Sequence, residues 1–135
     1  MKTILFILLS VVAFSAFSKN VVIMNASNSN AISEADIKKI FLGKKGAFDD
    51  GSKVLPVTYT EGDAIRAAFN DGMLGKSETK YVAYWSKMLF TGAGVPPQEV
   101  ASQDEMLDVI SKNPSTIGII EESKVNDSVK VVASF

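Results

Sequence analysis

Two reactive residue types are missing from this chain of 135 residues, which contains no histidine and no cysteine. Their absence removes the usual general base of enzymes, the thiolate nucleophile and the preferred ligands of transition metals. It also excludes disulfides and a lipid-modified cysteine. The carboxylates are better explained as caps and turn residues, and no serine–lysine pair lies in a nucleophile turn. We therefore predict that the protein is not an enzyme and needs neither a cofactor nor a metal.

An excess of positive charge is also missing. The chain carries 14 basic and 15 acidic residues, a formal net charge of −1. No basic run interleaved with aromatic residues is present, and the lysines at 38, 39, 44 and 45 fit a solvated helix face and loop. Nucleic acid is therefore not expected as a partner.

The apolar N-terminus is too short for a comfortable membrane span. Lys2 precedes an unbroken run of apolar and small residues from Ile4 to Phe17, whereas a spanning helix needs about 20 residues. Small residues then flank a cleavable bond after Ser18. We predict a signal peptide over residues 1–18, export to the periplasm rather than secretion from the cell, and no stable membrane anchor after cleavage. An uncleaved N-terminal anchor is the alternative.

The remaining chain is long enough for one domain. Removing residues 1–18 from the 135 leaves 117 residues, sufficient for one hydrophobic core but not for two. Because Lys2 is the only charged residue removed, 13 basic residues face 15 acidic ones and the net charge becomes −2. We therefore expect residues 19–135 to form a single domain.

Hydrophobic patterns predict an α/β domain. Short apolar runs indicate four strands, at residues 21–24, 54–59, 116–120 and 129–133. Apolar residues that recur every three or four positions indicate four helices, at residues 34–42, 63–74, 77–89 and 102–113. The first and last of these helices begin with capping-box patterns. No repeat or linker is visible. We expect helices on a mixed, largely parallel sheet.

Two local features leave alternatives open. Pro56 removes one ladder donor, which favours either an edge strand or the entry to a strand. The apolar stripe of the third helix favours the hydrophobic core but also suits a ligand platform; it comprises Tyr81, Tyr84, Trp85, Met88 and Leu89.

The junction from the second strand to the second helix, residues 54–69, is the best candidate for a binding site. The first N–H groups of a helix lack intrahelical partners and carry partial positive charge, so they can seat an anion. The candidate ligand-binding residues are Tyr59, Thr60, Gly62, Asp63 and Arg66. The alternative is that Gly62 and Asp63 simply turn and cap the helix.

Several blocks in order resemble a known family. They are Ile32-Ser33, the run from Ile37 through Lys44 (IKKIFLGK), Asp50-Gly51, Pro56-Val57, residues 66–69, Tyr84-Trp85, residues 89–92 (LFTG), Pro96-Pro97 and Ile117-Gly118. The set, spread over residues 21–132, resembles short single-domain relatives of the periplasmic substrate-binding protein of phosphate ABC transporters. The resemblance implies one lobe of a type II periplasmic binding protein, with a mixed five-stranded sheet.

The resemblance also implies that the phosphate ligands are altered. Phosphate binders carry an Arg, three residues, then Ser-Gly-Thr; here Tyr59, Asp63 and Ala64-Ile65 stand at those places. A carboxylate that caps the helix both occupies the seat and repels phosphate. Arg66 can fold back over the junction, or it can pair with Glu61 or Asp63 and leave the site full.

Two functions follow as hypotheses. The first is a phosphate-binding-protein-like domain whose affinity for phosphate or another small oxyanion is weak or lost, since the Arg, Ser, Gly and Thr ligands are replaced and a single lobe cannot enclose an anion. The second is a non-catalytic envelope module that docks on a transporter or porin, or dimerises, through the face left by the missing lobe. Residues 95–97 and the stripe of the third helix are the natural docking surfaces.

Overall fold

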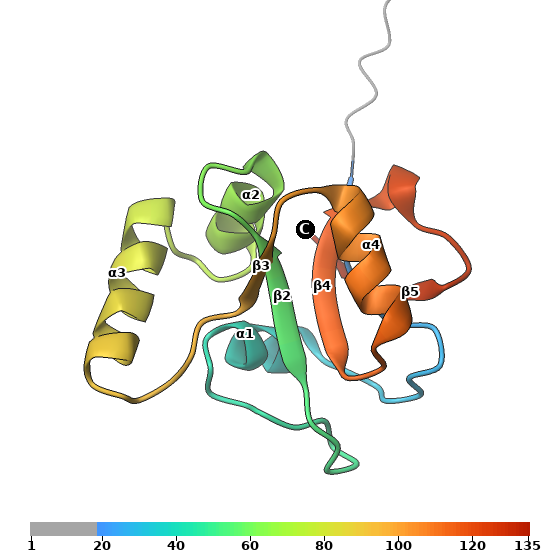
Figure 1. Ribbon diagram of the computed structural model, residues 1–135, viewed down its shortest axis with the longest axis horizontal. Helices are drawn as coiled ribbons and strands as arrows, with labels where there is room; N and C mark the ends of the chain where they lie inside the picture. Colours follow the sequence, from blue (N-terminus) through green and yellow to red (C-terminus); the bar gives the residue numbers. More distant parts are fainter. Residues whose placement is uncertain (1–18) are drawn as a thin grey trace, which may run out of the picture.

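The computed structural model describes residues 19–135 (Figure 1). The predicted signal peptide, residues 1–18, lies outside this range. The elements in order are β1 (Asn20–Asn25), α1 (Glu34–Phe41), β2 (Leu55–Tyr59), α2 (Ala64–Gly72), α3 (Glu78–Phe90), β3 (Gln98–Val100), α4 (Gln103–Lys112), β4 (Thr116–Glu121), the 3-10 turn η1 (Glu122–Lys124) and β5 (Val129–Ser134). No helix in the described range is long and apolar enough to cross a membrane.

The strands form one mixed sheet in the order β3-β2-β4-β1-β5. Strand β2 runs parallel to both of its neighbours, β3 and β4. Strand β1 runs antiparallel to β4 and β5. The predicted α/β class and the five-stranded mixed sheet are therefore confirmed, whereas the strand order could not be predicted from the sequence.

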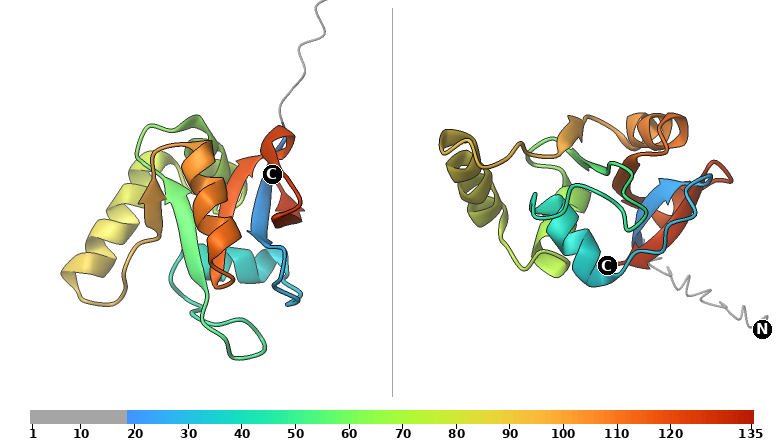
Figure 2. Two further views of the ribbon diagram at one scale, coloured as in Figure 1. Left: turned by 45° about the vertical axis from the view of Figure 1, so that its right-hand side comes forward. Right: turned by 90° about the horizontal axis from the view of Figure 1, so that it is seen from below.

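Helices cover both faces of the sheet (Figure 2). Helix α4 lies on one face, and α1 and α2 lie on the other. Strands β1 and β4 are buried almost throughout, as expected of apolar runs covered on both sides. Gly118 in β4 lets α4 approach closely, because a Cβ there would lie 2.5 Å from Met106 Sδ.

Strand β2 settles the question raised by Pro56. The strand lies between β3 and β4, so it is not an edge. Pro56 is the second residue of this strand, so the alternative that it marks the entry to a strand is the correct one. The edge on this side of the sheet is β3, a three-residue strand that the hydrophobic pattern did not predict because Gln98 and Glu99 are exposed and polar.

The predicted helix starts are confirmed. The side chains of Ser33, Asp63, Ser77 and Ser102 each accept a hydrogen bond from a first-turn backbone N–H. Gly43 follows α1 with a φ of 72°, the left-handed conformation in which a glycine commonly closes a helix. Local sequence therefore determines where these helices begin.

Helix α3 stands at the β3 end of the molecule (Figure 1). Of its predicted apolar stripe, Tyr81 and Trp85 are buried, whereas Leu89 is 55 % exposed. The core interpretation is therefore right for the first half of the stripe and wrong for its end. Phe90, the next residue, is 93 % exposed.

Candidate functional site

The turn between β2 and α2 carries the predicted anion seat. Asp63 N donates to Thr60 O at 3.2 Å, and Gly62 adopts a φ of 94° at the third position of this four-residue turn. That conformation is typical of a type II turn, which favours glycine there. Thr60 is exposed, and its N–H donates to Val100 O on β3. The turn thus delivers the chain directly to the helix N-terminus.

Asp63 occupies the N-terminus of α2. Its Oδ1 accepts from Ile65 N at 2.8 Å and from Arg66 N at 3.0 Å. These are the N–H groups that an oxyanion would otherwise use. The structure therefore places Asp63 as the sequence predicted, with its carboxylate on the free donors of the helix.

Tyr59 does not reach this seat. Its side chain is fully buried, and its hydroxyl donates to Ile119 O in β4 at 2.7 Å. Burial raises the Tyr59 pKa far above its ordinary value, with smaller contributions from Asp63 and Glu121, so the phenol stays neutral. Tyr59, one of the five candidate residues, therefore belongs to the hydrophobic core and not to the surface around the turn.

Arg66 is buried and held by several groups, being only 4 % exposed. Its Nη1 donates to Tyr59 O at 2.9 Å and to Glu99 Oε2 at 3.1 Å, and its Nη2 lies 2.6 Å from Glu78 Oε1. The guanidinium also lies 4.9 Å from the centre of the Tyr81 ring, a cation–π distance. Its charge is therefore already balanced.

The carboxylates that bind Arg66 differ from those expected. The sequence suggested Glu61 or Asp63 as partners, but Glu78 of α3 and Glu99 of β3 take this role. Asn70 on α2 holds Glu78 from the other side, with Nδ2 donating to Oε2 at 2.8 Å. Sequence reasoning missed both partners, because no local signal places Glu78 beside Arg66 and β3 was not predicted.

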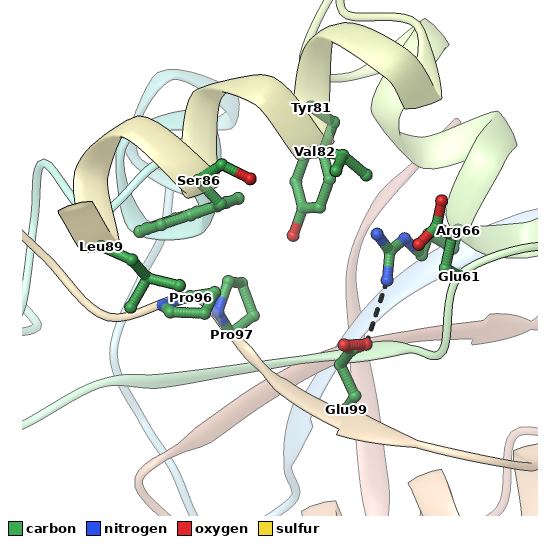
Figure 3. Close-up of a pocket in the computed structure, with 10 residues that line it drawn as sticks. Glu61, Arg66, Tyr81, Val82, Ser86, Leu89, Pro96, Pro97 and Glu99 are labelled. Carbon is green, nitrogen blue, oxygen red and sulfur yellow. Dashed lines mark hydrogen bonds and ion pairs between the residues drawn. The ribbon is translucent and has the colours of Figure 1, made fainter.

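A small cavity opens beside Arg66 (Figure 3). Its volume is about 170 Å³, and its wall comes from the β2–α2 turn, α2, α3 and residues 96–99. The Tyr81 hydroxyl and the Arg66 guanidinium both face the space between α3 and β3. Burial is the main cause that raises the pKa of Tyr81 to about 12, so its hydroxyl is neutral at physiological pH.

A second hollow lies around the entry to β2. It measures about 530 Å³ and is lined largely by apolar side chains that include Ile40, Val54, Leu55 and Pro96. Exposed Val95 lies on its rim, and Pro96 and Pro97 line both hollows. Leu89, Phe90 and Val95 are exposed large apolar side chains, and we call the segment that carries them, residues 89–97, the ridge.

The described residues offer little for metal chemistry. Between residues 19 and 135 no three or more histidine, cysteine, aspartate or glutamate side chains gather in a way that could hold a metal ion. The site consists instead of one buried cation, its carboxylate partners and a capped helix.

Solved structures share this architecture. A protein from Clostridium perfringens assigned as a phosphate ABC transporter substrate-binding protein, with phosphate bound, superposes with a TM-score of 0.68 at 21 % identity, over 85 % of this chain and 44 % of that one. The fold is that of a phosphate-binding-protein lobe. No family model and no curated protein matches the sequence.

Two further structures agree with this fold. An ABC-type phosphate transport receptor from Vibrio cholerae gives a TM-score of 0.64 at 17 % identity, covering 85 % of this chain and 45 % of its own. PstS from Borrelia burgdorferi gives a TM-score of 0.63 at 13 % identity, and the match covers 86 % of this chain and 47 % of that protein. The chain thus spans less than half the length of each of these proteins, and the resemblance read from the sequence is matched by structure.

Proposed function

We propose that this chain is a non-catalytic, phosphate-binding-protein-like domain of the periplasm whose phosphate seat is filled by its own side chains. In this proposal residues 1–18 are a signal peptide removed after export, and residues 19–135 are the working domain. The similarity to phosphate transport proteins supports the relationship. One observation carries the loss of affinity: Asp63 occupies the helix N-terminus while Glu78 and Glu99 neutralise Arg66.

Electrostatics explains why the seat rejects phosphate. An incoming anion must displace the Asp63 carboxylate from Ile65 N and Arg66 N, and it meets Glu61 and Glu99 beside the turn. Charge-assisted, bidentate contacts from arginine are the strong interactions in oxyanion sites. Arg66 already makes charge-assisted contacts with Glu78 and Glu99 within the chain, so little of its guanidinium remains for a ligand.

Isothermal titration of residues 19–135 with inorganic phosphate at low ionic strength tests the proposal. We expect no binding tighter than about 0.1 mM, which corresponds to roughly −5.5 kcal/mol. Replacing Asp63→Ser removes the carboxylate and should produce weak, millimolar binding, because Arg66 stays paired. The matched control Asp71→Ser makes the same charge change at the exposed far end of α2 and should show no phosphate binding.

A second function is favoured by a different observation. Leu89, Phe90 and Val95 are large apolar side chains with exposed fractions of 55 %, 93 % and 81 %. Exposed apolar groups that cluster on a surface are typical of docking sites. We propose that this ridge lets the domain dock on an envelope protein such as a transporter or porin.

Sedimentation equilibrium separates docking from self-association. A monomer at all concentrations supports docking on a different protein. A dimer that Phe90→Ser dissociates would instead assign the ridge to a second copy of the chain. The exposed polar substitution Lys87→Ser on the same helix is the control and should change neither result.

A further inference from the structure

The ridge separates two hollows of unlike charge. Pro96 and Pro97 line both hollows, so they lie on the boundary between them. The cavity beside Arg66 carries the carboxylates of Glu61 and Glu99 on its wall, and Figure 3 shows both acids on one side of the two prolines. The hollow at the entry to β2 has two lysines and no acid among its described lining residues. An acidic side and a basic side therefore flank one apolar segment.

Internal ion pairs leave one available charge on each side of the ridge. On the acidic side Glu99 already pairs with Arg66, and on the basic side Lys45 already pairs with two aspartates. Glu61 and Lys53 are exposed, and neither makes an ion pair within residues 19–135. The acid and the base that remain available to a partner surface are therefore Glu61 and Lys53.

The two available charges lie at opposite ends of one strand. Lys53 comes two residues before β2 and Glu61 comes two residues after it, so the extended strand holds them apart (Figure 1). Val57, the middle residue of β2, pairs with Gln98, which directly follows the ridge. The ridge therefore ends beside the midpoint between the acid and the base.

This arrangement makes the surface complementary to a second copy of itself. In an isologous dimer the same patch faces itself, so residue i contacts residue j of the partner and j contacts i. A twofold axis that lies in the interface and crosses β2 at its middle exchanges the two ends of the strand. The acid of each copy then faces the base of the other copy, and both apolar ridges lie within the same interface. Charge and polarity therefore match without a different protein.

We propose that a second copy of this chain covers the ridge in an isologous dimer. Glu61 pairs with Lys53 of the partner subunit at both ends of the interface, and the exposed side chains of Leu89, Phe90 and Val95 are buried between the copies. The inference rests on the docking function proposed for the ridge and concerns the same surface. A second copy and an envelope protein therefore compete for it.

Sedimentation equilibrium of residues 19–135 in phosphate-free buffer of low ionic strength measures the dimer, because surface charges are least screened there. We expect the native domain to dimerise as its concentration rises. Glu61→Lys and Lys53→Glu should each raise the dissociation constant at least about tenfold, since symmetry repeats each like-charge contact twice. Asp127→Lys and Lys124→Glu make the same charge changes on exposed residues near β5, at the other end of the sheet, and should have no effect.

A mixture of the two interface variants tests the symmetry directly. Alone, Glu61→Lys brings lysines together at both contacts, and Lys53→Glu brings carboxylates together. In a mixed pair, every contact between position 61 of one copy and position 53 of the other joins opposite charges again. We therefore expect the mixture to form heterodimers with a dissociation constant within about threefold of the native value.

Three results would overturn the inference: a native domain that stays monomeric up to about 0.5 mM, a dimer that the two charge reversals leave unchanged, or a mixture that fails to associate. The first would leave docking on a different protein as the function of the ridge. A dimer that Phe90→Ser leaves intact would also overturn the inference, because the ridge would then lie outside the interface. None of these results bears on the phosphate titration, so the failures are distinguishable.

Discussion

Arg66 is the residue on which this site depends. The Arg66 guanidinium joins α2, α3, β3 and the end of β2 through Glu78, Glu99 and Tyr59 O.

Replacing Arg66→Ala should lower the free energy of unfolding by about 3 kcal/mol. This loss of stability lies at the lower end of what breaking a buried ion pair usually costs, because Glu99 is half exposed and its carboxylate can be solvated by water. Urea unfolding at neutral pH measures this change. Glu99→Gln, which removes one exposed charge only, should cost less than about 1 kcal/mol. Equal losses in both variants would contradict the picture of Arg66 as the centre of the cluster.

Alkaline pH should weaken the fold through its buried phenols. Burial raises the pKa of Tyr81 to about 12 and that of Tyr59 further, whereas an unfolded tyrosine ionises near about 10. Between these values the folded state holds protons that the unfolded state has lost, so stability falls as pH rises from about 10 to about 12. Urea unfolding across this range measures the slope.

The variant Tyr81→Phe checks the cause of that slope. It removes one raised pKa without removing the ring that lies under Arg66. The pH dependence should therefore become shallower while Tyr59 preserves part of it. An unchanged slope would show that Tyr81 is not the titrating group.

Among the elements, α1 and α3 approach each other closely at Gly43. The φ of 72° favours glycine, and a Cβ there would lie 2.8 Å from Trp85 Cη2. Gly43→Ala should therefore cost more than the roughly 1–2 kcal/mol of the left-handed conformation alone. Thermal unfolding measures the loss, and Trp85 fluorescence should change with it. Gly51→Ala, also at positive φ but in open space, is the control and should cost only the conformational term.

Helix α3 should be less protected than the strands. It has 13 residues and buries only Tyr81 and Trp85, whereas β1 and β4 lie in the centre of the sheet with buried residues throughout. Regions with few buried contacts open at lower free energy. Hydrogen exchange should therefore proceed faster at α3 amides than at those of β1 and β4. Equal protection would mean that α3 unfolds only with the whole domain.

The sequence predicted those elements whose signals are local. Serine and aspartate caps located the helix starts, and β-branched runs located β1 and β4. It missed β3, because the exposed residues Gln98 and Glu99 give no apolar pattern. It placed Leu89 in the core because helical spacing says which residues share a face but not how far the neighbouring element extends.

At the scale of the whole molecule, the full site could not be predicted without knowing the topology of the fold. Asp63 was predictable as a cap from its position alone, and the structure agrees. The partners of Arg66 were not, because Glu78 and Glu99 reach it only when α3 and β3 fold back beside α2, a long-range arrangement without local signal. The chain covers less than half of each phosphate transport protein described above.

The most direct test of the filled seat is a phosphate titration followed by NMR at the amides of Ile65 and Arg66. These N–H groups donate to Asp63, so we predict that their chemical shifts stay unchanged up to about 10 mM phosphate at neutral pH. A saturable shift of both amides with a dissociation constant below about 0.1 mM would contradict the account, since phosphate would then have displaced the carboxylate.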